Sequence, residues 1–141
     1  MTAGPTLRSV STENVEIVQQ GFEAFNERGV EGIIPLIHPD FEATTPPSLA
    51  SEPDTYRGPD GIRRWFDSFI EVMDEIRWEA HEFHEVGDRV VVDFTLRARG
   101  KTTGLDFGQD AVMVWELRDG KAVRLSLFEN LEEAVAAAKA G

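Results

Sequence analysis

The sequence predicts an α+β fold in which a curved antiparallel sheet wraps around three N-terminal helices and is followed by a short C-terminal helix. Residues 15–25 and 62–73 carry apolar side chains at helical spacing. Residues 90–98 and 111–128 instead alternate between apolar and polar side chains, and Gly87-Asp88 and Asp119-Gly120 separate apolar runs as hairpin turns do. Helices followed by successive hairpins indicate a sheet that closes over the helices as a cone with an internal pocket.

The first helix is expected to begin at a cap formed by Ser11 or Thr12 and to end at Gly29. Residues 1–10 contain Gly4 and Pro5 and show no periodicity, so we expect a disordered arm there and a single domain over residues 11–141. The apolar stripe of this helix consists of Val15, Val18, Phe22 and Phe25.

A short second helix is expected over residues 30–37, because Pro35 limits its length. A first strand then places Phe41, Ala43 and Thr45 on one face. Residues 46–58 are rich in Pro, Ser and acidic residues and are expected to form a loop that acts as a rim or lid. The third helix begins at Pro59, and its apolar side consists of Ile62, Trp65, Phe66, Phe69 and Met73.

Four further strands follow, over residues 76–86, 90–99, 111–117 and 122–128, with a loose connection over residues 100–108, and residues 131–140 form the last helix. Because successive strand residues point to opposite faces, one set in each strand is expected to face the core. The inward sets are Val90, Val92, Phe94, Leu96 and Ala98, then Phe107, Gln109, Ala111, Met113 and Trp115, and finally Val123, Leu125, Leu127 and Glu129. The outer face is expected to carry Thr95, Arg97, Val112, Val114, Glu116, Arg124, Ser126 and Phe128.

The 141 residues include 26 acidic residues against 14 Lys and Arg, which gives a formal net charge of -12. Such a chain repels phosphate backbones and anionic lipid, so we expect neither nucleic acid nor a membrane as a partner. No apolar run approaches the roughly 20 residues of a membrane span, and residues 1–10 lack the pattern of a signal peptide. The chain also contains no cysteine. We therefore expect a cytoplasmic protein without disulfides.

Six short motifs spread over most of the chain carry a resemblance to a known family. They are Glu13-Asn14-Val15, Ala24-Phe25-Asn26, His38-Pro39-Asp40, Tyr56-Arg57-Gly58 before Ile62-Arg63-Arg64-Trp65-Phe66, Gly87-Asp88-Arg89-Val90 and Leu117-Arg118-Asp119-Gly120-Lys121. In this combination the chain resembles the SnoaL-like group of the nuclear transport factor 2-like superfamily, which includes polyketide cyclases and is similar to ketosteroid isomerase. The resemblance implies a cone with a largely apolar pocket and a homodimer that forms through the outer sheet face. It does not imply one activity, because this fold has many functions.

The catalytic groups of these enzymes have no counterparts in the chain. The resemblance to ketosteroid isomerase places Phe22 at its tyrosine oxyanion donor, Thr45 at its proton-abstracting aspartate and Met113 at its protonated acid. In the similar limonene epoxide hydrolase and polyketide cyclases, the catalytic positions correspond to apolar residues of this chain, namely Val90, Val92 and Leu127. None of the three known chemistries is therefore expected here.

The inward residues predict a small-molecule site, because an apolar cone with a few polar groups is typical of such sites. The polar candidates are Thr45, Gln109 and Glu129. The residues expected to contact a ligand are Phe22, Phe41, Thr45, Phe66, Phe69, Trp78, Phe94, Gln109, Met113, Trp115, Leu125 and Leu127.

Glu129 is the first candidate for catalysis, because a partly buried carboxylate has a raised pKa and can act as a general base near neutrality. The alternative is that Glu129 lies in solvent at the strand end, near the N-terminus of the last helix. Glu82 and His84 are the second candidate, a carboxylate–imidazole pair that faces the pocket if Trp78 does. Phe83 and Val86 break that alternation, so a bulge or an exposed strand end is the alternative.

His81, Glu82, His84 and Glu85 are potential metal ligands by residue type, but the two histidines lie three apart on a strand and point to opposite faces. No nucleotide-binding motif is present either, so we expect no metal and no cofactor. Two functions remain open at this point. The chain binds a small, largely apolar molecule, with or without acid–base chemistry, or it is a non-catalytic dimeric module whose pocket is filled by its own side chains.

Overall fold

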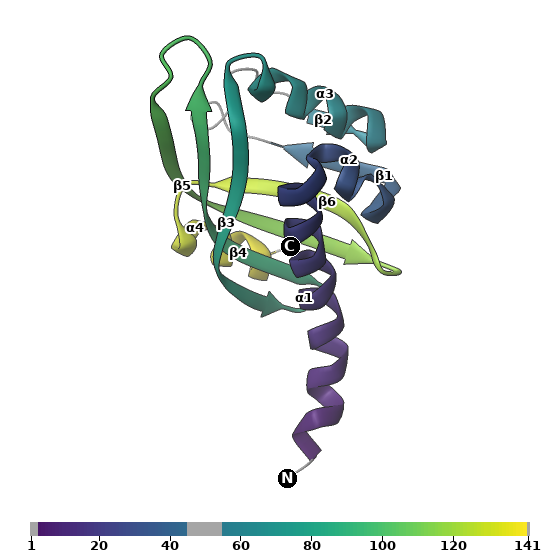
Figure 1. Cartoon of the computed structure of the whole chain (residues 1–141). Coiled ribbons are helices and arrows are strands. Elements are labelled where there is room, and N and C mark those ends of the chain that lie inside the picture. Colours follow the sequence, from purple (N-terminus) through teal and green to yellow (C-terminus); the bar gives the residue numbers. More distant parts are fainter. Residues whose placement is uncertain (1–2, 45–54, 141) are drawn as a thin grey trace.

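The computed structural model describes residues 3–44 and 55–140 and confirms the α+β class (Figure 1). In chain order the elements are α1 (Ala3–Arg28), α2 (Val30–Ile33), a 3-10 turn η1 (Ile34–Leu36), β1 (Ile37–Thr44), β2 (Thr55–Arg57), α3 (Gly58–Ile70), β3 (Met73–Val86), β4 (Arg89–Gly100), β5 (Asp106–Arg118), β6 (Lys121–Phe128) and α4 (Leu131–Ala140). Residues 45–54, which include Thr45 and most of the expected loop, lie outside the described residues.

The described strands form one six-stranded sheet in the order β2-β1-β6-β5-β4-β3. Its pairs are antiparallel as expected, except that β1 pairs with β6 in parallel, so the sheet is mixed. A hairpin forces its two strands to run antiparallel, but β1 and β6 are separated by most of the chain and are free of that constraint. The expected turn between β5 and β6 is present, and both Asp119 and Gly120 have positive φ, 55° and 77°.

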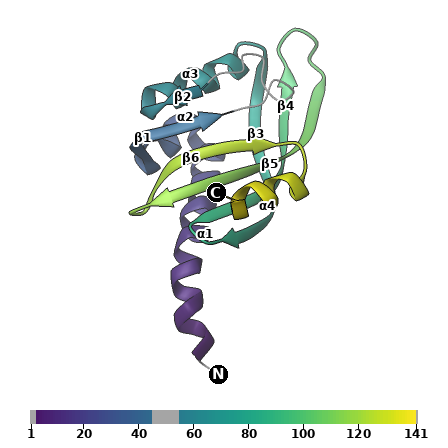
Figure 2. The same ribbon diagram turned by 180° about the vertical axis from the view of Figure 1, so that it is seen from behind.

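The helices lie on both faces of the sheet. Figure 1 shows α1, α2 and α3 on one face, and Figure 2 shows α4 on the opposite face. The main core lies between the first three helices and the sheet, and its fully buried side chains include Phe41, Ile62 and Leu125. We call the sheet face toward this core the inner face and the other the outer face.

Several elements differ from the sequence expectation. Helix α1 already begins at Ala3 rather than at Ser11 or Thr12, which is compatible with Pro5 because proline is tolerated in the first helical turn. Helix α3 ends at Ile70, so Met73 belongs to β3, where it pairs with Gly100. Residues 55–57 of the expected loop form the edge strand β2.

A bulge in β3 decides which residues of that strand face the core. Ala80 pairs with Phe94, whereas Glu82 pairs with Asp93, so one extra residue, His81, stands in the strand. The extra residue reverses the alternation, since a shift of one residue exchanges the two faces. Phe83 therefore faces inward and packs against the main core. Glu82 and His84 point to the outer face, as the bulge alternative predicted.

Helix α4 covers part of the outer face. Ala134 and Ala138 of this helix are buried against three valines of the sheet, Val91, Val112 and Val114. The sequence analysis expected Val112 and Val114 on the outer face, which is correct, but they are only 2% and 7% exposed because α4 packs on them. The chain itself therefore buries most of the apolar surface on which the expectation of a dimer partly rested.

Two residues expected to face inward are exposed. Phe107 is 41% exposed, because it lies at the start of β5 where the sheet extends past the helices. Glu129 follows the last residue of β6 and is exposed ahead of α4, as its alternative predicted.

Candidate functional site

An apolar cavity of about 40 Å³ lies between α3 and the inner face of the sheet. Helix α3 contributes the aromatic side chains of its apolar side, and β3, β4, β5 and β6 contribute the opposite wall. The lining residues are Trp65, Phe66, Phe69, Ile76, Trp78, Phe94, Leu96, Gln109, Ala111, Met113 and Leu127. We call this the α3 cavity.

The structure brings seven of the predicted ligand-contact residues together in the α3 cavity, namely Phe66, Phe69, Trp78, Phe94, Gln109, Met113 and Leu127. Phe41 and Leu125 are fully buried in the core and do not line it. Trp65, Ile76, Leu96 and Ala111 line the cavity although they were not singled out as ligand contacts. The signal for three of them was available, since helical spacing placed Trp65 on the apolar side and strand alternation placed Leu96 and Ala111 inward.

A second, smaller cavity of about 20 Å³ lies beneath α1. Phe22 and Trp115, both predicted ligand contacts, line this second space instead of the α3 cavity. Its lining residues are Ile17, Val18, Gly21, Phe22, Ile33, Leu36, Ile37, Trp78, Trp115, Leu117 and Ala122. The indole Nε1 of Trp115 is buried and has no hydrogen-bond partner among the described residues. We call this the α1 cavity.

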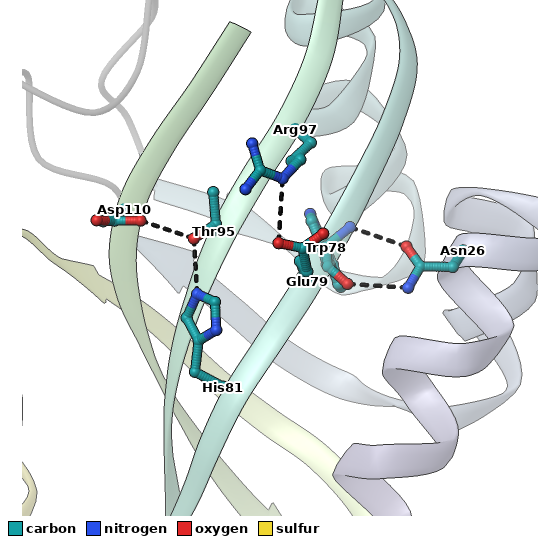
Figure 3. Close-up of polar contacts among 7 residues, drawn as sticks. All are labelled: Asn26, Trp78, Glu79, His81, Thr95, Arg97 and Asp110. Carbon is teal, nitrogen blue, oxygen red and sulfur yellow. Dashed lines mark hydrogen bonds and ion pairs between the residues drawn. The ribbon is translucent and has the colours of Figure 1, made fainter.

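Trp78 is held through both its ring and its backbone. Its ring stacks on Phe25 with a centroid distance of 3.7 Å and an interplanar angle of 8°, and Phe22 contacts it at a tilt. Asn26 of α1 binds the backbone of Trp78 twice, at 2.9 Å to its carbonyl oxygen and at 2.8 Å from its amide nitrogen (Figure 3). The Trp78 side chain is therefore a fixed wall of the site.

The α3 cavity offers little chemistry of its own. Gln109 contributes an amide, and the remaining described lining residues are apolar or aromatic, so no titratable side chain lines this space within residues 3–44 and 55–140. The exposed Glu129 is not part of the lining. The described lining thus has one amide for orientation and no general acid or base.

Glu82 and His84 do lie together, but away from the cavity. The distance from Glu82 Oε1 to His84 Nε2 is 3.4 Å, and the two side chains are 66% and 37% exposed on the outer face. The predicted pair is therefore formed, and the bulge at His81 places it on the side of the sheet opposite the ligand-contact residues.

The outer face also carries a polar chain that crosses three strands. His81 Nε2 lies 2.7 Å from Thr95 Oγ1, and the Thr95 hydroxyl donates to Asp110 Oδ1 at 2.6 Å (Figure 3). Thr95 is 6% exposed, and no other polar or charged residue is buried among those that the structure describes. Next to it, Arg97 Nε donates to Glu79 Oε1 at 3.0 Å. The sequence analysis placed Thr95 and Arg97 on this face but did not find the polar chain, because the broken alternation at Phe83 and Val86 suggested a bulge without locating it at His81.

Metal binding has no support in the part of the chain that the structure describes, where no group of three or more His, Asp or Glu side chains is arranged to hold an ion. Nor is any described helix both long and apolar enough to span a bilayer.

These features define a class of protein: a cone-shaped α+β domain with an apolar interior between its helices and its sheet. The sequence model of the SnoaL-like domain matches residues 18–125, and the chain belongs to that family. The comparison with curated proteins gave no match.

Solved structures with the same fold support this assignment. The chain is 30% identical to TerC, which was co-crystallised with polyporic acid, over 92% of this chain and 99% of TerC, with a TM-score of 0.74. It is 27% identical to an NTF2-like protein of unknown function from Burkholderia pseudomallei, over 88% of this chain and 95% of the other, again with a TM-score of 0.74. A Catenulispora acidiphila protein with a ketosteroid isomerase-like fold shares the fold at 16% identity and a TM-score of 0.70, with 86% and 90% of the two chains covered.

Proposed function

We propose that the protein binds a small, largely apolar molecule in the α3 cavity. The observation that carries this proposal is the composition of the lining, in which aromatic and aliphatic side chains surround one amide, that of Gln109. Apolar sites with few polar groups are typical of small-molecule binding, where the polar group orients the ligand. The likeness to TerC, co-crystallised with polyporic acid, supports the binding of a small organic molecule.

A ligand must displace part of the lining to enter. The α3 cavity measures about 40 Å³, whereas an engineered cavity that binds benzene measures about 150 Å³. The lining residues that are only half-buried are the ones free to move, namely Phe69, Ile76, Leu96 and Gln109. Phe69 is the largest of these, and it contacts Trp65 edge-on at 5.3 Å near the end of α3. We infer that Phe69 turns outward when a ligand binds.

Acid–base chemistry is not part of this proposal, because no titratable side chain lines the described cavity. Glu129 and Glu82 are exposed outside it. Glu129→Gln and Glu82→Gln are therefore expected to leave ligand affinity unchanged.

The test measures binding of phenol and indole by tryptophan fluorescence and by the rise in melting temperature. Phe69→Ala should bind at least one of these compounds about tenfold more tightly than the wild type, because it lacks the side chain that a ligand must displace in the wild type. Phe83→Ala is the matched control, since Phe83 is equally half-buried and packs on the same core without lining the α3 cavity. Ala111→Leu fills the cavity and should abolish binding.

Circular dichroism first establishes that each variant is folded, since overpacking at Ala111 costs about 1–3 kcal/mol. Absence of binding to both the wild type and Phe69→Ala would overturn the proposal. Equal gains in Phe69→Ala and Phe83→Ala would also contradict it, because the effect would then come from loosening of the core rather than from the α3 cavity.

A second candidate function is a non-catalytic homodimeric module that assembles through the outer sheet face. The small volume of the α3 cavity favours it, since the chain's own side chains fill most of the cone. The exposed part of the outer face carries charges of both signs, including Arg97 with Glu79 and Arg124 near Glu116. A two-fold contact can pair such charges between identical surfaces.

A further inference from the structure

We infer that Trp78 limits the length of the molecule that the interior can hold, because its side chain separates the α3 cavity from the α1 cavity. This inference rests on the proposed function and names the ligand class: a compact molecule of about one aromatic ring, rather than an elongated one. Trp78 is the position in the sequence that decides whether a compact or an elongated molecule fits.

Trp78 is the shared wall of the two cavities. Among the described residues that line them, it alone belongs to both sets. The α3 cavity lies on one side, toward Phe66 and Phe69, and the α1 cavity on the other, toward Phe22 and Trp115. Without the indole of Trp78, the two spaces would join into one elongated space along the inner face of the sheet.

The wall is built to stay in place. Asn26 fixes the Trp78 backbone through two hydrogen bonds (Figure 3). Phe25 stacks flat on the Trp78 ring. Phe94 and Trp115 contact the ring from the sheet side, with centroids 6.5 Å away in each case. Trp78 is only 4% exposed, so it has no solvent-filled space into which to rotate. In contrast to Phe69, Trp78 does not yield to a ligand.

The α1 cavity differs from the α3 cavity in the polar group that lines it. The buried indole Nε1 of Trp115, which lines the α1 cavity, carries a donor without a partner among the described residues. A buried unpaired donor favours any group that can accept from it. A molecule that extended from the α3 cavity past Trp78 into the α1 cavity would therefore bind more tightly if its far end carried an oxygen that accepts from Trp115 Nε1.

The test compares three Trp→Leu variants, each with phenol as the compact probe and 4-phenylphenol as the elongated probe. Trp78→Leu joins the cavities, whereas Trp65→Leu enlarges the α3 cavity alone and Trp115→Leu enlarges the α1 cavity alone. We expect Trp78→Leu to bind 4-phenylphenol at least about tenfold more tightly than the wild type and the other two variants do. Phenol affinity should change less than the affinity for 4-phenylphenol does between wild type and Trp78→Leu, because a single ring fills only part of the joined space.

Biphenyl has the same length but no oxygen, so the increase in its affinity from wild type to Trp78→Leu should be smaller than the increase for 4-phenylphenol. The double variant Trp78→Leu/Trp115→Phe should remove that difference, because it lacks the indole donor. Where Trp78→Leu does not fold, Trp78→Phe keeps a ring against Phe25 and is expected to show the same order of affinities with smaller differences.

Two results would overturn the inference. One is tight binding of 4-phenylphenol by the wild type, and the other is an equal gain in Trp65→Leu and Trp78→Leu. Failure of the proposed function gives a different pattern, in which neither phenol nor indole binds the wild type or Phe69→Ala, while the Trp78→Leu gain for 4-phenylphenol persists.

Discussion

Asn26 binds the backbone of Trp78 through both ends of its side-chain amide. Its Nδ2 donates to the Trp78 carbonyl oxygen at 2.9 Å, and its Oδ1 accepts from the Trp78 amide at 2.8 Å. Strand β3 is the last strand of the sheet, so these two backbone groups have no neighbouring strand to pair with. Unpaired strand edges are satisfied in native proteins by some covering element. Here one side chain of α1 provides the pairing and ties the helix to the sheet.

Asn26→Ala should therefore destabilise the protein by about 2–4 kcal/mol, because it leaves a partly buried N–H and C=O without partners. Asn26→Asp keeps the acceptor but sets a carboxylate oxygen against the Trp78 carbonyl oxygen, so it should also destabilise the protein. Urea unfolding monitored by tryptophan fluorescence measures both. Gln19→Ala is the control, since Gln19 is exposed on the same helix. A loss for Asn26→Ala no larger than that of Gln19→Ala would contradict this role.

The sequence predicted the fold class because it depends on periodic patterns. The strand β4 shows this most clearly, with Val90, Val92 and Phe94 buried inward as alternation required. The turn at Asp119-Gly120 was predictable for the same reason, since its positive φ angles need tolerant residues. The parallel pairing of β1 with β6 was not predictable, because no local pattern encodes which distant strand a strand will join.

The site was predictable only in part. Alternation correctly brought Phe94, Gln109 and Met113 to one cavity. The position of Glu82 and His84 depended on a bulge at His81, and the partner that hydrogen-bonds this residue is Thr95, fourteen positions further along the chain. The volume of the cavity was not predictable, because α3 lines it together with strands that lie far from it in the sequence.

The His81–Thr95–Asp110 chain is expected to stabilise the bulge. Thr95→Val removes the hydroxyl while keeping the shape, and should cost about 1–3 kcal/mol since the partners of a buried group lose their hydrogen bonds. The double variant Thr95→Val/His81→Ala should cost less than the sum of the single variants by more than about 0.5 kcal/mol, as residues of one network do. Thermal unfolding of the four proteins measures this coupling. Strictly additive losses would show that the two residues act independently.

Replacing Phe94 or Leu125 by alanine should lower the free energy of unfolding by about 2–5 kcal/mol, because the neighbouring core cannot fill the space that the side chain leaves. They are 3% and 0% exposed. Arg97→Ala, on the same strand as Phe94 but on the other face, should cost less than about 1 kcal/mol, since its ion pair with Glu79 is exposed. Chemical unfolding gives the three values. A loss at Arg97 comparable to that at Phe94 would contradict the strand alternation on which the inner face is defined.

Glu31 and Arg63 join α2 to α3 through two hydrogen bonds, of 2.7 and 3.1 Å. The hydrogen bond from Arg63 holds the pKa of the Glu31 carboxyl below its usual value. A lowered folded-state pKa means that this contact stabilises the protein above the pKa of the unfolded chain and is lost as the pH falls through the folded-state pKa. At about pH 7, Glu31→Gln should thus have a lower melting temperature than the wild type. At about pH 2, the two proteins should have the same melting temperature. Since both residues are exposed, salt should reduce the difference; a difference that persists in acid would contradict the assignment.

The homodimer proposed above makes a distinct prediction about the outer face. With Val112 and Val114 covered by α4, what remains for a partner is mainly polar and charged, including Arg97, Glu79 and Asp110. A dimer held by such a surface should weaken with salt, because exposed charges are screened. Light scattering at about 50 μM should therefore show a dimer in low salt that dissociates in about 1 M salt.

Arg97→Glu tests which surface is involved, because reversing that charge opposes Glu79 and its counterpart on a second copy. We expect this variant to be monomeric while remaining folded. Arg64→Glu is the control, since Arg64 is exposed on α3, on the helix side of the sheet. A wild-type monomer in low salt would exclude the dimer. A dimer that survives Arg97→Glu and is lost in Arg64→Glu would move the interface to the helices and leave the outer sheet face, with its His81–Thr95–Asp110 chain, open to solvent.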